Sequence, residues 1–183
     1  MKTRIALFPI AAALALGATA AQAEGMSSLP GMQTLSKYEP TIALTGGAMN
    51  APSANDDAIA VYGLEINMNV AAFQELNSHI RTHLQVNRVD ESGVRATTAE
   101  LSPRYTVPMG NSFSAGIGPV LAWVDADNTH GNQNLFGYGA VAGLNYRHGH
   151  MYVGLDLRYM NTSERQSVTF ENTILQAKIG YSF

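Results

Sequence analysis

The sequence predicts an all-β protein: an eight-stranded antiparallel transmembrane β-barrel, built as an up-and-down meander. Three observations predict this fold. Apolar and polar residues alternate with a period of two along most of the chain, which gives a strand one apolar and one polar face. The alternating segments are long enough to cross a bilayer, which takes about 9–11 tilted residues. An export signal precedes them.

Residues 1–23 form this predicted signal peptide. Lys2 and Arg4 precede an apolar run at 5–17, and Ala21 and Ala23 are the small residues that a signal peptidase recognises. We expect cleavage after Ala23. We expect residues 24–40 to form a loosely structured periplasmic lead-in and residues 41–183 to form the transmembrane barrel.

Eight alternating segments follow, with strands expected at 41–49, 58–70, 78–89, 96–107, 112–125, 134–147, 150–160 and 169–183. The apolar positions that set the period most clearly are Tyr62, Leu64, Ile66 and Met68; Ile80, Leu84 and Val86; Leu101, Tyr105 and Val107; Val153, Leu155, Leu157 and Tyr159; and Leu175, Ala177, Ile179, Tyr181 and Phe183. The positions between them carry mostly polar residues or glycine, so each segment is two-faced.

The predicted links alternate in length. Those after the second, fourth and sixth strands are short, around Phe73, 109–111 and Gly149. Those after the odd-numbered strands are longer and polar, at 50–57, 90–95, 126–133 and 161–168. A soluble barrel hides its apolar face, whereas a membrane barrel turns it to lipid, and the period alone does not decide between them. Short periplasmic turns and longer outer loops are typical of the membrane barrel.

Aromatic residues of the apolar face also favour the membrane barrel. With a periplasmic N-terminus, they gather at strand ends in two girdles, as interfacial rings do. The periplasmic girdle contains Tyr105, Phe113, Tyr146, Tyr181 and Phe183, and the outer girdle contains Tyr62, Trp123, Phe136, Tyr159 and Phe170.

The composition limits the function classes. The chain has 183 residues, a net charge of −3 and no cysteine. The lack of cysteine excludes a disulfide-stapled domain and cysteine-bound zinc or iron–sulfur centres. A nucleic-acid-binding protein normally has a concentrated basic surface, so we expect no nucleic-acid partner.

On these patterns the chain resembles the small eight-stranded outer-membrane barrels of Gram-negative bacteria, the OmpA-, OmpX- and OmpW-like group. The resemblance is sharpest at the C-terminus, which ends with Leu175, Ala177, Ile179, Tyr181 and Phe183 at alternate positions. It implies that this ending is the signal read by the barrel-assembly machinery. It also implies delivery by periplasmic chaperones and a place among the lipid and lipopolysaccharide of the outer membrane.

The polar face predicts a charged lumen, a candidate site that contains Glu65, Arg81, His83, Glu100, Arg104, Arg147, Asp156, Arg158 and Lys178. Charges away from water need partners, so we expect a plug of salt bridges and hydrogen bonds. A selective conduit or gate is the alternative. For Arg147 two positions stay open, the lumen and the periplasmic rim. Gly116, Gly118, Gly137, Gly139 and Gly143 either make room for large neighbours or leave a small cavity.

Catalytic and metal sites are weaker hypotheses. His83 with Glu65 or Glu100 and Ser102 offers a base, an acid and a nucleophile, but a lipid ester would struggle to reach the mid-lumen. His148 and His150, with His79 nearby, are too few for a convincing metal site. We therefore expect no enzyme, no cofactor and no metal.

The outer loops are expected to be short, without a protruding ribbon, and acidic. The acidic residues are Asp56, Asp57, Asp90, Glu91, Asp125, Asp127, Glu164 and Glu171, against Arg88, Arg95 and Arg165. The sequence thus predicts a monomeric barrel with a structural or envelope-interaction role. The alternatives are a narrow channel or binding barrel for a small solute or hydrophobic ligand, and, less favoured, a lipid A-modifying enzyme.

Overall fold

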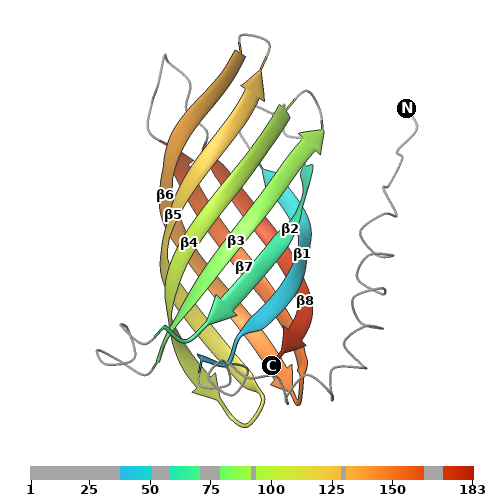
Figure 1. Cartoon of the computed structure of the whole chain (residues 1–183), viewed down its shortest axis with the longest axis vertical. Coiled ribbons are helices and arrows are strands. Elements are labelled where there is room, and N and C mark those ends of the chain that lie inside the picture. The colour runs from blue at the N-terminus through green and yellow to red at the C-terminus, as the bar shows by residue number, and fades with distance from the viewer. Residues whose placement is uncertain (1–37, 51–57, 71–78, 92–93, 129–130, 163–170) are drawn as a thin grey trace, which may run out of the picture.

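The structure is a computed structural model that describes residues 38–50, 58–70, 79–91, 94–128, 131–162 and 171–183. Eight antiparallel strands form a closed barrel in chain order (Figure 1). They are β1 (Thr41–Asn50), β2 (Ile59–Met68), β3 (Ile80–Glu91), β4 (Val94–Met109), β5 (Phe113–Asn128), β6 (Gly131–His148), β7 (Met151–Thr162) and β8 (Asn172–Ser182). The predicted fold class is confirmed.

The barrel closes because β8 returns to β1. The register runs from Thr41 opposite Ser182 to Asn50 opposite Thr173, so no sheet edge is left along this seam. In the described residues no helix is long and apolar enough to cross a membrane. The signal peptide and residues 24–37 of the lead-in lie outside the described residues.

The barrel is apolar outside and polar inside over most of its height. Ile117 is 62% exposed, and Leu157 and Ile179 are also exposed, whereas the inward-facing side chains of Glu65 and Asp156 are buried. A continuous apolar outer wall does not suit water. It is the arrangement of a barrel that faces lipid.

The two ends of the barrel differ. At the end that we call the turn end, Gly110 and Gly149 make the β4–β5 and β6–β7 turns with φ of 80° and 57°, and the C-terminus lies there too (Figure 1). Backbone in this left-handed region favours glycine. The opposite end, where β5 joins β6, is called the loop end.

The prediction of outer loops at 90–95 and 126–133 is wrong, because most of these residues belong to strands. Asp90 pairs with Arg95 and Asp125 with Asn134, so 90–95 and 126–133 are almost wholly hairpin. Backbone pairing continues beyond the apolar band of the outer wall. The alternation of apolar and polar residues, which reveals a strand in the sequence, stops at the edge of that band.

The wall is uneven in height at this end. The β5–β6 hairpin reaches Asn128 opposite Gly131, and β4 follows it to Arg95 opposite Asp127, whereas β6 pairs with β7 only as far as Gly137 (Figure 1). The link around Phe73 is not short, because β2 ends at Met68 and β3 begins at Ile80. Phe73 itself lies outside the described residues.

Candidate functional site

The lumen is filled by side chains that come mostly from one part of its wall. Apart from Arg147 on β6, the predicted charged residues stand at inward positions of β2, β3, β4, β7 and β8. Those buried are Glu65, His83, Glu100, Arg104, Asp156, Arg158 and Lys178. The facing stretches of β5 and β6 contribute small inward residues such as Gly116, Val120 and Gly143. The long polar side chains therefore have room to reach across the lumen. The interior of an eight-stranded barrel is just wide enough for side chains to fill it.

Asp156 is the centre of the charged cluster. Its Oδ2 lies 2.7 Å from Arg104 Nη1 and 2.9 Å from Lys178 Nζ, and Arg158 Nη2 is 4.0 Å away. Gly143 faces it across the β6–β7 pair, and a Cβ added at Gly143 would overlap the Asp156 carboxylate. At this position glycine makes room for a large neighbour, which answers one of the questions that the sequence left open.

Glu65 shares its cations with Asp156. Lys178 Nζ donates to Glu65 Oε2 at 3.0 Å, and Arg104 Nη2 lies 3.8 Å from the same oxygen. Asn67 donates to Glu65 Oε1 at 2.9 Å. His83 Nδ1 lies 3.1 Å from Glu65 Oε1, without the alignment of a hydrogen bond. Lys178 and Arg104 thus tie the two carboxylates into one cluster.

A second ion pair lies one step nearer the loop end. Arg158 Nη1 is 2.7 Å from Glu100 Oε2, and its Nη2 donates to Gln85 Oε1 at 2.6 Å. Asn87 donates to Glu100 at 2.8 Å, and Gln85 Nε2 donates to Gln176 at 2.6 Å. The sequence analysis did not single out Gln176, because its contacts depend on how β8 meets β3 across the lumen.

The buried charges balance. Three acids, Glu65, Glu100 and Asp156, face three bases, Arg104, Arg158 and Lys178, and all six lie inside hydrogen-bonded or ion-pair contacts. A buried charge left unpaired is strongly destabilising. Among the described residues, the arrangement therefore leaves no excess charge at the centre of the lumen.

The two remaining predicted cations, Arg81 and Arg147, lie at the turn-end mouth of the lumen. Each places Nη1 3.3 Å from Glu39 Oε2. Arg147 is 33% exposed by its side chain, so of the two positions that the sequence left open it takes the rim. Sequence reasoning missed Glu39, since it precedes β1 and belongs to no strand pattern.

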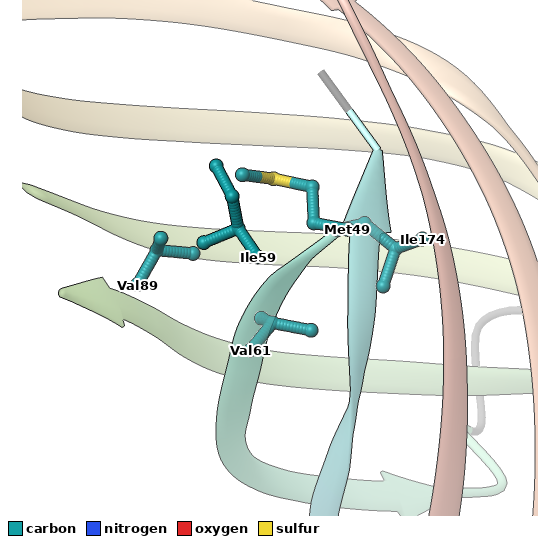
Figure 2. Packing of buried hydrophobic residues seen from close by; sticks show 5 residues of the cluster. All are labelled: Met49, Ile59, Val61, Val89 and Ile174. Atoms are coloured by element: carbon teal, nitrogen blue, oxygen red, sulfur yellow. The ribbon is translucent and has the colours of Figure 1, made fainter. Parts of the chain in front are cut away.

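Towards the loop end the lumen becomes largely apolar, which the sequence analysis did not predict, although Thr98, Thr162 and Asn172 are buried there too. One buried cluster contains Met49, Ile59, Val61, Val89 and Ile174 (Figure 2). A second contains Ala96, Ala122, Val124, Leu135 and Met160. Apolar constrictions resist water and ions by dewetting, so these clusters are the part of the lumen that would least favour the passage of ions.

The hypothetical catalytic residues lie within this packed interior. The β3–β4 register sets His83 opposite Ser102, and both side chains are buried. Ser102 Oγ accepts from Arg104 Nε at 3.3 Å, and Glu100 is engaged by Arg158. Within the described ranges no three potential metal ligands come together.

The girdle residues lie on the outer wall. Phe113 packs on Tyr146 with ring centroids 4.8 Å apart, and Tyr181 on Phe183 at 5.0 Å. Trp123 faces Phe136 in the β5–β6 register. The other girdle residues that the structure describes, Tyr62, Tyr105 and Tyr159, are exposed, as are Leu175 and Ile179 of the C-terminal ending, with Ala177 between them on the same face. Phe170 lies outside the described residues.

Three histidines join the turn-end girdle, which the sequence did not reveal. His79, His148 and His150 stack on Tyr105, Tyr146 and Tyr181, with interplanar angles of 18°, 10° and 6°. These pairs are adjacent or cross-strand neighbours at the barrel rim. They widen the aromatic belt rather than form a ligand set.

Only part of the acidic rim lies in the described residues. Asp90 pairs with Arg88 at 3.7 Å and with Arg95 at 3.3 Å, and Tyr159 donates to Glu171 at 2.7 Å. Asp56, Asp57, Glu164 and Arg165 lie outside the described residues. These three contacts are local surface pairs, whereas Asp125 has one buried oxygen, Oδ1, without a hydrogen-bond partner.

Comparisons with known proteins agree with this architecture. No protein-family model and no curated protein sequence matches the chain. In structure it is similar to Neisserial surface protein A, with a TM-score of 0.59 and 12% identity over 80% of this chain and 97% of that one.

Two proteins of Pseudomonas aeruginosa are similar as well. The N-terminal β-barrel domain of OprF has a TM-score of 0.56 and 15% identity over 78% of this chain and 97% of that one. Outer membrane protein H (OprH), solved in micelles, has a TM-score of 0.54 and 14% identity over 79% and 99%. At these identities the likeness shows the fold, and the expected resemblance to small eight-stranded outer-membrane barrels is confirmed at that level.

Proposed function

We propose that this chain is an outer-membrane β-barrel protein with a closed lumen, which acts in envelope structure or envelope interaction without catalysis. The observation that carries this proposal is the filling of the lumen by side chains at two levels. Ion pairs around Asp156 and Glu100 fill the middle, and the apolar cluster around Ile59 and Val61 fills the loop end.

The proposed location rests on the outer wall and on the fold. An apolar wall between aromatic belts suits a bilayer, and the structural neighbours include outer-membrane proteins. We further propose export by the signal peptide, insertion by the barrel-assembly machinery through the ending at Phe183, and a monomer among lipid and lipopolysaccharide.

Planar-bilayer recording of the refolded chain tests the closed lumen. We expect no stable conductance, whereas reproducible, ion-selective openings would overturn the proposal. Folding is checked on the same sample by gel mobility with and without heating, because a folded barrel migrates differently when unheated. The two measurements together separate a closed barrel from an unfolded one.

A narrow channel is the second candidate, and one observation favours it. Asp156 Oδ1 and Arg158 Nε are buried without a hydrogen-bond partner. Buried polar atoms of this kind usually have partners, so these two atoms are the ones that a water or a solute would contact in a conducting lumen. Small openings that disappear in Asp156→Asn and persist in Asp90→Asn would support the channel.

The absence of catalysis has its own test. Lipid A from cells with and without the protein should give identical mass spectra. A mass change that is lost in His83→Ala would reverse the proposal, since His83 is the only candidate base that faces both an acid and Ser102 among the described residues.

A further inference from the structure

The turn-end mouth of the lumen brings two arginines to one point. Arg81 Nη1 and Arg147 Nη1 each lie 3.3 Å from the same oxygen, Oε2 of Glu39, and Asn69 Nδ2 lies 3.4 Å from it. Three donors from β3, β6 and the end of β2 thus converge on a single acceptor. Like charges brought together in this way need an anion between them.

Glu39 fits this position poorly. Charge-assisted bonds of guanidinium to carboxylate are usually about 2.7–2.9 Å long and often bidentate, whereas these contacts are longer and share one oxygen. Two positive groups face one negative group, so a positive charge remains. The backbone of Glu39 also has φ of 44°, a conformation that residues other than glycine adopt at a cost.

The barrel wall orients the two arginines together with the Glu39 backbone, whose carbonyl oxygen accepts from Arg81 Nη2. Arg81 Nε donates to Asn67 Oδ1 at 2.7 Å, and its side chain is only 12% exposed. Arg81 Nη2 and Arg147 Nη2 both donate to Thr41 Oγ1 at 3.3 Å, and Arg147 lies over the Tyr152 ring at 6.0 Å. These contacts would remain after the Glu39 carboxylate moved away.

We propose that Arg81 and Arg147 form an anion-binding site for a phosphate group, and that Glu39 occupies it as an exchangeable internal ligand. A phosphate has several charged oxygens, so each guanidinium would gain an oxygen of its own. The Glu39 carboxylate can leave because the side chain is 53% exposed. The backbone on either side stays in place, since Asn69 N–H donates to Tyr38 O and Phe183 N–H donates to Pro40 O. The site does not depend on whether the lumen conducts.

The test uses the full chain refolded in a non-ionic detergent, with inorganic phosphate as the probe in isothermal titration calorimetry. Glu39→Gln removes the internal competitor while keeping the size of the side chain. It should tighten phosphate binding by about tenfold, as expected when an occupied state that excludes the ligand is about nine-tenths populated. Arg147→Gln should abolish binding.

Arg88→Gln is the matched control. Arg88 is a half-exposed arginine at the loop end, paired with Asp90, so it carries the same charge change far from the mouth. It should bind phosphate like the unaltered chain. Equal weakening in Arg88→Gln and Arg147→Gln, or unchanged affinity in Glu39→Gln, would overturn the site.

A second arm identifies the source of the phosphate group. The same variants are measured in mixed micelles that contain phosphatidylglycerol instead of free phosphate. Binding of free phosphate assigns the site to a soluble anion, and binding of the lipid alone assigns it to a headgroup. Binding of neither by Glu39→Gln, with folding verified by heat-modifiable mobility, refutes the proposal.

Discussion

Neutralising Asp156 should strongly destabilise the barrel. Asp156→Asn keeps the size of the side chain but removes the charge that faces Arg104 at 2.7 Å and Lys178 at 2.9 Å. All three groups are buried. Because removal of one partner leaves a buried charge uncompensated, we expect a loss of about 3–5 kcal/mol in the free energy of unfolding. Glu65 still lies near both cations, which places the loss towards the lower end.

The same substitution at the surface gives the control. Asp90 is partly exposed and pairs with Arg88 and Arg95 at the loop end, and exposed pairs contribute about 0–1 kcal/mol. Denaturant unfolding in micelles, followed by the fluorescence of Trp123, the only tryptophan in the sequence, measures both variants. Losses that agree within about 1 kcal/mol would refute the assignment of Asp156 as the centre of the plug.

Two further predictions concern the wall. Gly143→Ala should lower the free energy of unfolding by about 1–3 kcal/mol through overpacking, because the added Cβ would overlap the Asp156 carboxylate. Gly46 has open space around it, so Gly46→Ala should not destabilise the fold comparably in the same unfolding assay. Leu157→Arg, near the middle of β7 on the outer wall, should cost about 2–4 kcal/mol in a bilayer and Met109→Arg at the turn end about 0–1. Equal effects within either pair would count against the overlap or the lipid-facing wall, respectively.

The strands and their faces could be predicted from the sequence because one simple rule governs them. Inward and outward positions alternate, so the contrast between Leu64 or Ile66 and Glu65 reveals both the strand and its orientation. The rule fails where the contrast ends. At 90–95 every residue but Val94 is polar or glycine, so apolar and polar positions do not alternate there. The strand pairing at this point is set by the partner backbone, which the pattern does not encode.

The partners within the lumen could not be predicted in the same way. The period of two places Asp156 and Lys178 inside the barrel. Their pairing across the lumen, however, depends on the register of all eight strands and on which strands carry small inward residues. Glu39 shows the same limit: it binds two arginines from β3 and β6, yet nothing around it in the sequence marks it as part of the site.

The apolar clusters favour one of the two interpretations of the lumen. The charged cluster alone would allow an exchange of partners, since Arg104 lies 2.7 Å from Asp156 and 3.8 Å from Glu65, and Lys178 touches both acids. Such an exchange leaves no charge bare, so it is a plausible way to open the middle. It would not open the loop end, where Ile59 and Val61 are buried in a cluster that has no alternative partners to exchange. A conducting state must therefore separate packed apolar side chains as well as ion pairs, and that second requirement is why a closed barrel is the better proposal.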